Sequence, residues 1–422
     1  MGGPSKARID KAGRLLSTPP DPLTEEYLEL EDVFDTYRKT FLPKLTELTS
    51  QIQFWLTNNG EHYYIAQRLK RKPQILRKLR RLSARLTQLQ DIGGCRIIVR
   101  SNRQVDELKD FIEKKIAETE YLNLVRATDY RPRGRDDSGY RAVHLIIENK
   151  EKVIELQIRS MIQHYWAESI ERTSVIYGSH LKEQEGDPVV IKYFKNLSDI
   201  FYELEAGRQP GGHAQVELDT LRRRAEEIIE ASGKGKALGT FVNDDIMRTL
   251  AEKERSSAKG INNWIFVFDW NSGSFITWDI VDRDPDQAAD TYSKYERQYP
   301  AEDQLEVVLI GSSDVSTVRK THSHYFGVAA YDKVLESLQD SIVGFSKRME
   351  LDVGARQILG VLARRRFWGS KKASEDTLRN HFCKDVITFD GSLKSLRLKG
   401  FVSTEGGVSL EIKRKSEIEQ YL

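Results

Sequence analysis

Cysteine is scarce in this 422-residue chain, which contains only Cys95 and Cys383. Two cysteines so far apart build neither a disulfide framework nor a cysteine zinc site, which favours a reducing cytosol. No apolar stretch reaches the length that spans a bilayer, and residues 1–11 carry no apolar signal core. We therefore expect a soluble, cytoplasmic protein with no membrane partner.

A strong charge imbalance is also absent. The chain carries 66 Lys and Arg residues against 64 Asp and Glu residues, which gives a formal net charge of +2. This balance excludes a protein that binds polyanions over its whole surface and directs attention to local clusters. Repeats of solenoid period are absent too. A chain of this length exceeds what one hydrophobic core usually serves, so two or three domains are expected.

The first half of the chain predicts helices around a few strands. Helices are expected over 23–58, 75–89, 104–116, 161–177 and 192–204. Strands are expected at 95–99, 142–148 and 153–159, with a loop over 129–140. In the last of these strands, alternation places Ile154, Leu156 and Ile158 on one face. Glu155, Gln157 and Arg159 share the other face, which is therefore solvated or lines a polar pocket.

The second half follows a linker at Gln209-Pro210-Gly211-Gly212, where we place a domain boundary. A basic helix is expected over 221–229. Strands at 263–269, 274–281 and 306–310, a hairpin turn at 271–273 and helices over 285–298 and 313–322 predict a small α/β module. Helices over 355–366, 374–382 and 391–399, followed by strands at 401–402 and 408–412, have the order of a winged helix.

A dense basic cluster precedes the first predicted strand. Its members are Arg68, Lys70, Arg71, Lys72, Arg77, Lys78, Arg80, Arg81 and Arg85. Such a run is either a solvated helix face or a cradle for a polyphosphate, because Arg and Lys neutralise the charge of phosphoryl oxygens.

Two acidic residues are candidate metal ligands. Asp91 precedes the turn at Gly93-Gly94, and Glu155 lies on the polar face of its strand. An Asp before glycines is often only a turn residue. Two carboxylates on core strands also suit Mg2+, which prefers a few carboxylate oxygens together with substrate phosphates.

The loop between these carboxylates is basic and ends in an aromatic residue. It reads Tyr130-Arg131-Pro132-Arg133-Gly134-Arg135 and then Ser138-Gly139-Tyr140-Arg141-Ala142-Val143-His144. A loop of this kind either holds an anionic ligand and stacks a base on its ring, or is simply exposed.

Five successive motifs in the chain resemble those of the RelA/SpoT alarmone synthetase family, in the family's order, over about residues 20–205. They are the basic run from Arg68 to Leu79, Asp91 to Val99, Ser138 to His144, Glu155 to Arg159, and His164-Tyr165-Trp166-Ala167-Glu168. Five motifs in order are far more specific than one. The resemblance implies a GTP/GDP pyrophosphokinase of the stringent response, which transfers pyrophosphate from ATP to the 3′-hydroxyl of a guanine nucleotide and makes (p)ppGpp.

The resemblance also implies a role for each matching residue. Arg68 and Arg96 match the arginines that sandwich the adenine of ATP, and Lys70 and Lys78 match residues on its phosphates. Asp91 and Glu155 match the catalytic magnesium ligands, with Glu155 also a candidate general base. Tyr140, His144 and Gln157 match the acceptor side.

The implied architecture is α+β. A mixed-sheet, nucleotidyltransferase-like pyrophosphokinase domain with N-terminal helices is expected over 1–208, a linker and helix over 209–235, the small α/β module over 236–340 and the winged helix over 345–422. The His-Asp pair of the family's hydrolase domain is not found in the sequence, which predicts a monofunctional synthetase.

Departures from the family pattern fall on the acceptor side, so alternatives stay open. The loop 131–137 is richer in Arg and Asp than is usual, and Arg172 follows Glu171 where many relatives carry His. A toxin-type enzyme that acts on the tRNA 3′ end is one alternative. Another is a nucleotide-sensing regulator whose winged helix binds DNA through Lys394, Arg397 and Lys399, or docks a regulatory protein. His322 and His324 lack a third metal ligand nearby and are expected in a surface or core role.

Overall fold

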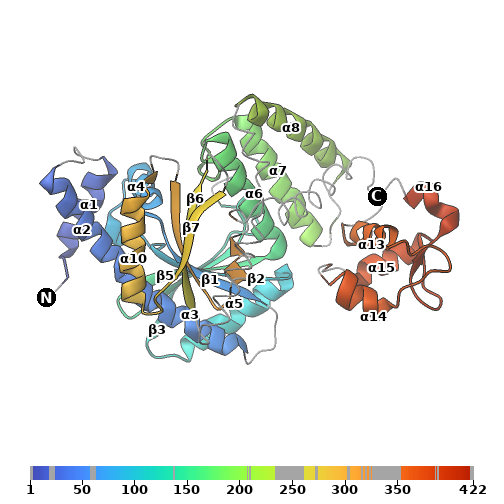
Figure 1. Cartoon of the computed structure of the whole chain (residues 1–422), viewed down its shortest axis with the longest axis horizontal. Coiled ribbons are helices and arrows are strands. Elements are labelled where there is room, and N and C mark those ends of the chain that lie inside the picture. Colours follow the sequence, from blue (N-terminus) through green and yellow to red (C-terminus); the bar gives the residue numbers. More distant parts are fainter. Residues whose placement is uncertain are drawn as a thin grey trace. The chain divides into compact units, whose positions relative to one another are not determined.

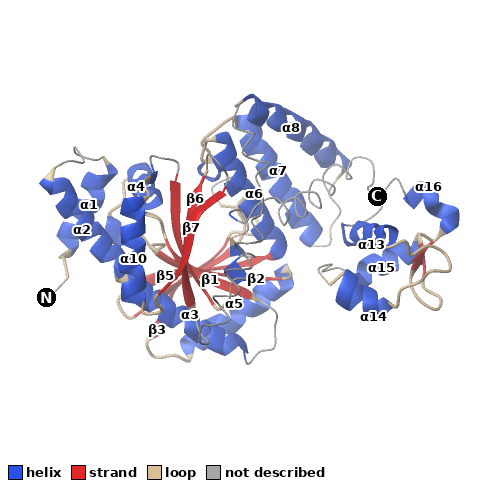
Figure 2. Ribbon diagram, in the orientation of Figure 1, coloured by secondary structure: helices blue, strands red, loops and turns tan. Residues whose placement is uncertain are grey.

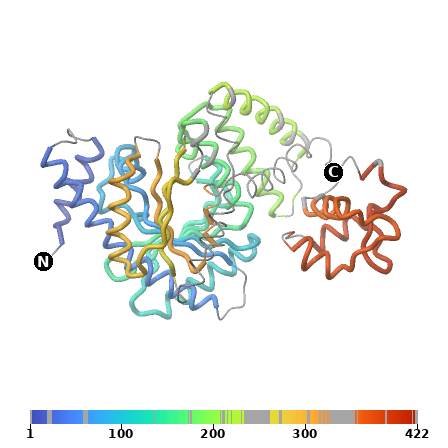
Figure 3. The backbone as a smooth tube through the Cα atoms, in the orientation of Figure 1, coloured from blue at the N-terminus to red at the C-terminus, as the bar shows by residue number. Residues whose placement is uncertain are grey.

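The computed structural model describes most of the chain. The described residues are 3–18, 24–57, 63–135, 138–206, 208, 211–232, 261–270, 274–301, 305–314, 317–318, 321–322, 325, 353–384, 386 and 389–418. The chain divides into two compact units. The first comprises residues 1–209 and 225–330, and the second comprises residues 210–224 and 331–422. Figure 3 traces the backbone of both.

The first unit is built on one eight-stranded sheet (Figures 1 and 2). Its strands are β1 (Tyr64–Leu69), β2 (Gly93–Val99), β3 (Leu122–Asp129), β4 (Val143–Asn149), β5 (Lys152–Ser160), β6 (Asn262–Asp269), β7 (Ser274–Val281) and β8 (Leu305–Ser312). They lie in the order β3-β4-β5-β2-β1-β8-β6-β7. The β2–β5 pair is parallel and the other pairs are antiparallel. The mixed sheet confirms the α+β class expected for the synthetase region.

Helices surround this sheet. They are α1 (Lys6–Ser17), α2 (Glu25–Lys39), α3 (Phe41–Thr57), α4 (Lys72–Leu82), α5 (Asn102–Ala117), α6 (Met161–Tyr177), α7 (Pro188–Glu205) and α10 (Pro285–Gln298), with 3-10 turns at Leu86–Gln88 and Leu181–Glu183. Among them, α3, α5, α6 and α10 pack directly on its strands. Side-chain caps begin several of them, for example Ser101 at α5 and Asp284 at α10. A further helix, α8 (Gly212–Ala231), crosses the boundary between the two units.

The predicted alternation in β5 decides which face of the sheet is core. Ile154, Leu156 and Ile158 are fully buried in the main hydrophobic cluster, together with residues of α3 and α5. Residues at the intervening positions point to the other face, because successive side chains of a strand alternate. The polar face of β5 is therefore free to build a site, as the sequence pattern indicates.

The strands expected in a separate module instead continue the sheet that β1 to β5 form. β8 pairs with β1, with Gln67 opposite Gly311 and Arg68 opposite Ile310. Gly311 leaves room for the Gln67 side chain, since a Cβ atom at this position would lie 2.5 Å from Cγ of Gln67 and displace it. Pairing with β8 covers an edge of β1 that would otherwise expose unpaired backbone groups. The prediction of an independent module over 236–340 is corrected in this respect, although residues 236–260 and 326–340 lie outside the described residues.

Two largely buried ion pairs connect α10 and β8 to α2 and to the start of α4. Arg38 of α2, whose side chain is 2% exposed, donates to both carboxylate oxygens of Glu296 in α10, one of them at 3.1 Å. Arg71, which caps α4, pairs with Glu306 of β8. Both carboxylates come from residues that follow the predicted domain boundary, so the two parts of the chain share one folded unit.

The second unit has its own core. It contains α13 (Val353–Arg364), α14 (Glu375–Thr377) with a π-helical turn over Leu378–Phe382, α15 (Phe389–Leu398), the paired strands β9 (Val402–Ser403) and β10 (Ser409–Leu410), a 3-10 turn (Ile412–Arg414) and α16 (Lys415–Ile418). Leu359, Leu378 and Leu396 are among its buried residues. This is the element order that the sequence indicates, and the winged-helix identity and its partners stay predictions.

Other differences concern short elements. Strands β1 and β3 and helix α1 are not expected from the sequence. The helix predicted over 75–89 begins at Lys72 and ends at Leu82, where Ser83 adopts a left-handed conformation. Residues 209–210 of the linker and the turn at 271–273 lie outside the described residues. Within the described ranges, no helix is both long and apolar enough to cross a bilayer.

Candidate active site

A polar cavity of about 210 Å³ opens on the polar face of β1, β2 and β5. The strand register places its floor residues side by side, since Ala66 lies opposite Arg96, and Gly94 lies opposite both Arg68 and Glu155. Its walls include residues of α4, of the loop before β4, of α6 and of the 3-10 turn after α6. The charged residues that line it are Arg68, Lys70, Lys78, Arg81, Arg96, Arg135, Arg159, Lys182, Asp91, Glu155, Glu171 and Glu183. Eight cations against four carboxylates make the cavity suited to an anionic ligand.

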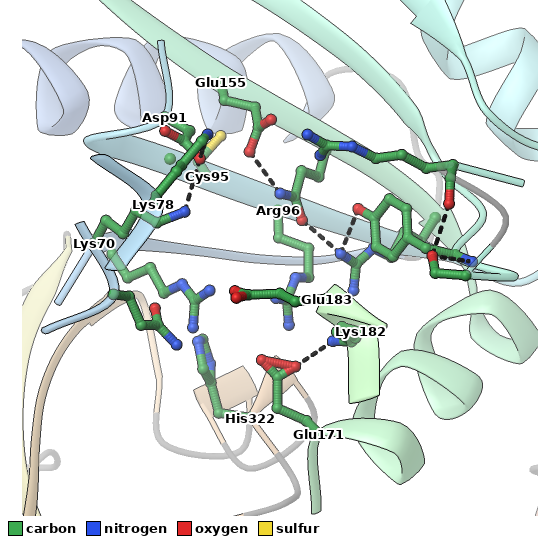
Figure 4. Close-up of a pocket in the computed structure, with 18 of the residues that line it drawn as sticks. Lys70, Lys78, Asp91, Cys95, Arg96, Glu155, Glu171, Lys182, Glu183 and His322 are labelled. Carbon is green, nitrogen blue, oxygen red and sulfur yellow. Dashed lines mark hydrogen bonds and ion pairs between the residues drawn. The ribbon is translucent and has the colours of Figure 1, made fainter. Parts of the chain in front are cut away.

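Asp91 lies where the chain turns into β2, between two lysines. Its Oδ2 accepts hydrogen bonds from Nζ of Lys70 at 2.7 Å and from Nζ of Lys78 at 2.6 Å. Burial alone would raise the pKa of Asp91, but the two ammonium groups outweigh it and lower that pKa. Asp91 is therefore held as a carboxylate, and Figure 4 shows the three side chains together at one end of the cavity.

Glu155 is held by its neighbours on β4 and β5. Its Oε1 pairs with Nδ1 of His144 at 2.9 Å, and its Oε2 accepts from Nε2 of Gln157 at 2.6 Å. Burial opposes ionisation, yet His144 and the hydrogen bonds lower the pKa of Glu155 well below its usual range. Glu155 is therefore also ionised, and it is a weak base in this arrangement.

The two carboxylates fit a magnesium ion on one observation in particular. Oδ1 of Asp91 is buried and has no hydrogen-bond partner among the described residues, whereas Oδ2 has two. A buried carboxylate oxygen without a donor is costly unless a ligand satisfies it. In the part of the chain that the structure describes, no cluster of three His, Cys, Asp or Glu residues is placed to hold a metal. Two carboxylates suffice for Mg2+ when substrate phosphates and water complete the coordination.

Tyr140 lies within a chain of hydrogen bonds that runs from Arg159 to Glu155. Its hydroxyl accepts from a guanidinium nitrogen of Arg159 at 2.6 Å and lies 2.7 Å from Nε2 of His144, whose Nδ1 faces Glu155. Although burial opposes it, Arg159 and then His144 lower the pKa of Tyr140 to about 8. The Arg159 guanidinium also lies 4.8 Å from the centroid of the Tyr140 ring. A base that stacks on Tyr140 would therefore use the other face of the ring.

Two hydrogen bonds hold the guanidinium group of Arg96. One of its guanidinium nitrogens donates to the backbone carbonyl of Thr321 at 2.8 Å and to Oε1 of Glu168 at 3.3 Å. Burial, followed by the nearby Arg159, lowers the pKa of Arg96 to about 10. The guanidinium remains charged at neutral pH in a fixed orientation.

Nearly all the catalytic and nucleotide-binding residues predicted from the sequence line the cavity. Those that line it are Arg68, Lys70, Lys78, Asp91, Arg96, Tyr140, Glu155 and Gln157. His144 does not line the cavity but lies behind Tyr140 and Glu155, because its side chain is 3% exposed and bonded to both. This position agrees with the supporting place expected for His144 beside Tyr140, and its role toward an acceptor stays a prediction.

Several residues at the site carry no predicted role. Arg159 shares the polar face of β5, and Glu168 lies within the last motif, so both have local signals. Lys182, which pairs with Glu171, and His322 have none, because they reach the cavity from segments outside the motifs. His322, expected on a surface or in a core, is 2% exposed and lines the cavity, and His324 lies outside the described residues.

Gly139 places Tyr140 in the cavity wall. Its φ is +83°, and a Cβ atom there would lie 3.0 Å from Cβ of Ser198 and 3.1 Å from Cα of Lys195. The hydroxyl of Ser198 donates to the carbonyl of Gly139, which ties the loop to α7. Both the backbone conformation and the close packing therefore require glycine.

Replacing Gly139 with alanine is expected to lower the free energy of unfolding by about 2 kcal/mol, from strain at positive φ and from overpacking. The displaced Tyr140 should also weaken binding of the acceptor. Thermal melts and the KM of the acceptor check this, with Gly211→Ala as control, since nothing lies within 4 Å of a Cβ atom at Gly211. A melt and a KM equal to those of the unmodified protein would contradict the argument.

Comparisons with known proteins agree with this geometry. Residues 67–181, which hold Asp91, Glu155 and most of the cavity, match the family described as "Region found in RelA / SpoT proteins". No curated protein matches the chain significantly.

Among solved structures, the chain resembles small alarmone synthetase 1 from Bacillus subtilis bound to its product pppGpp, with 21% identity and a TM-score of 0.35 over 42% of this chain and 94% of that one. A GTP pyrophosphokinase family protein from Streptococcus pneumoniae shares 20% identity, with a TM-score of 0.31 over 50% of this chain and 98% of that one. Residues 67–181, which form most of the cavity, thus contain the region found in RelA / SpoT proteins.

Proposed function

We propose that this domain transfers pyrophosphate from ATP to the 3′-hydroxyl of GDP or GTP and so makes (p)ppGpp. The observation that carries the proposal is the pairing of two ionised carboxylates, Asp91 and Glu155, in a cavity with an excess of cationic side chains. In this reaction the acceptor hydroxyl attacks the β-phosphorus of ATP, a new O–P bond forms, the hydroxyl proton is released to water, and AMP leaves with the electrons of the broken P–O bond.

Asp91 and Glu155 would hold the magnesium ion. When bound, Mg2+ supplies charge stabilisation for the phosphoryl oxygens and a template that orients them. Lys70 and Lys78 contact the same oxygen of Asp91, so both ammonium groups lie where phosphates that share the metal would come. These lysines neutralise the charge that develops on the transferred group.

The donor base would bind between Arg68 and Arg96. Planar guanidinium groups stack well on purines. The contacts of Arg96 with Glu168 and Thr321 fix its plane before the nucleotide arrives, which reduces the entropy that binding costs.

The acceptor would bind on the side of Tyr140 and Gln157. Glu155 is a poor candidate for the general base, since a carboxylate with a strongly lowered pKa takes up a proton weakly at neutral pH. Its negative charge is better used in holding the metal. The hydrogen-bond chain from Arg159 through Tyr140 and His144 to Glu155 orders this side of the cavity.

The test is a transfer assay with ATP labelled at its terminal phosphate and with GDP, GTP and deacylated tRNA as separate acceptors. Label on GDP or GTP, separated by thin-layer chromatography, is the expected result. Label on tRNA alone would replace the proposal with a tRNA pyrophosphokinase. No transfer to any acceptor would leave a nucleotide-binding regulator in its place.

Removing divalent metal is expected to reduce transfer at least about 100-fold, because no metal ion would then offset the repulsion between the phosphates and the two carboxylates. The measurement is the initial rate with excess EDTA and again after Mg2+ is restored in excess. Recovery to the starting rate is expected. A rate that EDTA leaves unchanged would exclude the metal role of Asp91 and Glu155.

A further inference from the structure

The segment after β8 returns to the cavity, far along the sequence from the family motifs. Its described residues form part of a helical turn in which the amide of Thr317 donates to Oδ1 of Asp314 at 2.7 Å, and the amide of His322 donates to the carbonyl of Val318 at 3.0 Å. Thr321 and His322 end this turn and are almost completely buried. The turn belongs to the same compact unit as the cavity.

Buried contacts hold the turn against the site from both ends. Glu306 of β8 accepts from Arg71 at the start of α4, from the hydroxyl of Tyr325 and, at 2.8 Å, from Nε1 of Trp270. Val318 and Tyr325 pack in one hydrophobic cluster with Ala66 of β1. Because α4 and β1 also carry Lys78 and Arg68, the turn is fixed relative to the residues that line the cavity.

Thr321 holds a residue of the cavity wall through its backbone carbonyl. Its carbonyl lies in the last turn of the helical segment, where carbonyl groups lack a partner within the helix. This carbonyl accepts from the Arg96 guanidinium at 2.8 Å. Arg96 therefore depends for its orientation on a residue 225 positions later in the chain.

His322 contributes its ring to the same wall. The Thr321 hydroxyl donates to the carbonyl of Thr317 at 2.8 Å, so at 2.9 Å from Nδ1 of His322 it acts as the acceptor. This contact places the proton on Nδ1 and fixes the ring. Figure 4 shows the imidazole at the end of the cavity opposite Asp91 and Glu155.

We propose that Thr321 and His322 complete the subsite for the purine of the donor nucleoside triphosphate. Thr321 positions Arg96, and the ring of His322 contacts the base as a specificity-determining wall. The inference rests on the proposed function, because the donor base is assigned to Arg96 there. His322 directly follows Thr321, whose carbonyl binds Arg96, so we assign its ring to the Arg96 side of the cavity.

Two substitutions separate contact with the base from support of the turn. His322→Asn keeps a donor near the position of Nδ1 for the Thr321 hydroxyl but removes the ring. His322→Phe keeps a planar ring but removes that donor. His381→Ala is the matched control, since His381 is exposed in the second unit. Melting temperatures of all variants identify any loss of folding.

The measurement is the affinity of the full-length protein for the non-hydrolysable analogue α,β-methylene-ATP with Mg2+, by isothermal titration calorimetry. Loss of a stacking ring is expected to weaken binding about tenfold in His322→Asn, whereas His322→Phe should stay within about threefold of the unmodified protein. In transfer assays the KM for ATP should rise by the same factor, with kcat and the acceptor KM nearly unchanged.

Several results would overturn the inference. Unmodified affinity in His322→Asn, or weaker binding only in His322→Phe, would show that the histidine merely supports the turn. A change in the acceptor KM alone would place His322 in the other subsite. Failure of the unmodified protein to bind the analogue would overturn the donor subsite itself. If the analogue binds but no acceptor is labelled, the proposed function fails while the calorimetric comparison still decides the role of His322.

Discussion

Replacing Glu155 with glutamine is expected to reduce the rate of pyrophosphate transfer by about 10³-fold or more, because a preorganised charge at the reacting phosphates is lost. The amide has nearly the size of the carboxylate, and its oxygen can still accept from His144 or Gln157. The fold should therefore survive, and the loss should appear in kcat. The transfer assay with saturating ATP and acceptor measures it.

Asp91→Asn is expected to show a loss of the same order, since its carboxylate supplies the other half of the proposed metal site. Glu185→Gln serves as the control, because this glutamate is exposed and does not line the cavity. Melting temperatures within a few degrees of the unmodified protein would show that the losses are chemical. A Glu155→Gln enzyme with more than a tenth of the original rate would eliminate Glu155 as an essential metal ligand.

The part of the site that could be predicted is encoded locally. Alternation in the strand from 153 to 159 is enough to separate Ile154, Leu156 and Ile158 from the polar side chains that face the cavity. The turn after Asp91 and the basic helix that follows β1 are likewise visible in short stretches of sequence. Such signals depend on neighbours within a few positions, and the structure confirms the placement of these residues while their roles stay predictions.

The part that could not be predicted depends on pairing between distant segments. Strand β1 has only six residues, and half of them are polar or partly exposed. Nothing within it indicates that β8, about 240 residues later, covers its edge. The contact between Arg96 and Thr321 follows from that pairing, so neither it nor the position of His322 has a signal in the sequence around either residue.

His144 illustrates a different limit of prediction from sequence. Its place in a motif and on β4 predicts that it lies near the acceptor subsite, and it does lie beside Tyr140. A side chain in a motif either contacts the ligand or supports another side chain that contacts it. Which of the two applies depends on how deeply the side chain is buried, and a motif does not encode this depth. The two hydrogen bonds of His144 use both ring nitrogens within the protein.

A chain that ends at Arg208 is expected to lose its fold, although the motifs of the family all precede that residue. Deletion of β8 would expose the edge of β1, and deletion of α10 would remove Tyr292 from the main hydrophobic cluster. Arg38 and Arg71 would also lose their carboxylate partners, Glu296 and Glu306.

A chain that ends at Ala330 is the matched comparison, since it keeps the eight-stranded sheet and removes residues 331–422 of the second unit. It should give a soluble product with a cooperative melt, whereas the shorter chain should aggregate or melt without cooperativity. Size-exclusion chromatography and circular dichroism distinguish the two. A shorter chain that melts cooperatively within about 5 °C of the longer one would show that the later strands are accessory.

In the full-length protein, the dependence of stability on residues after Arg208 can be measured at one ion pair. Glu296→Gln leaves the Arg38 guanidinium buried without its carboxylate, and the free energy of unfolding should fall by about 3 kcal/mol. The double substitution Arg38→Met with Glu296→Leu removes both charges and should recover most of that loss. Because these residues lie on α2 and α10, recovery in the double variant would show that the loss comes from an unpaired charge buried where α2 meets α10.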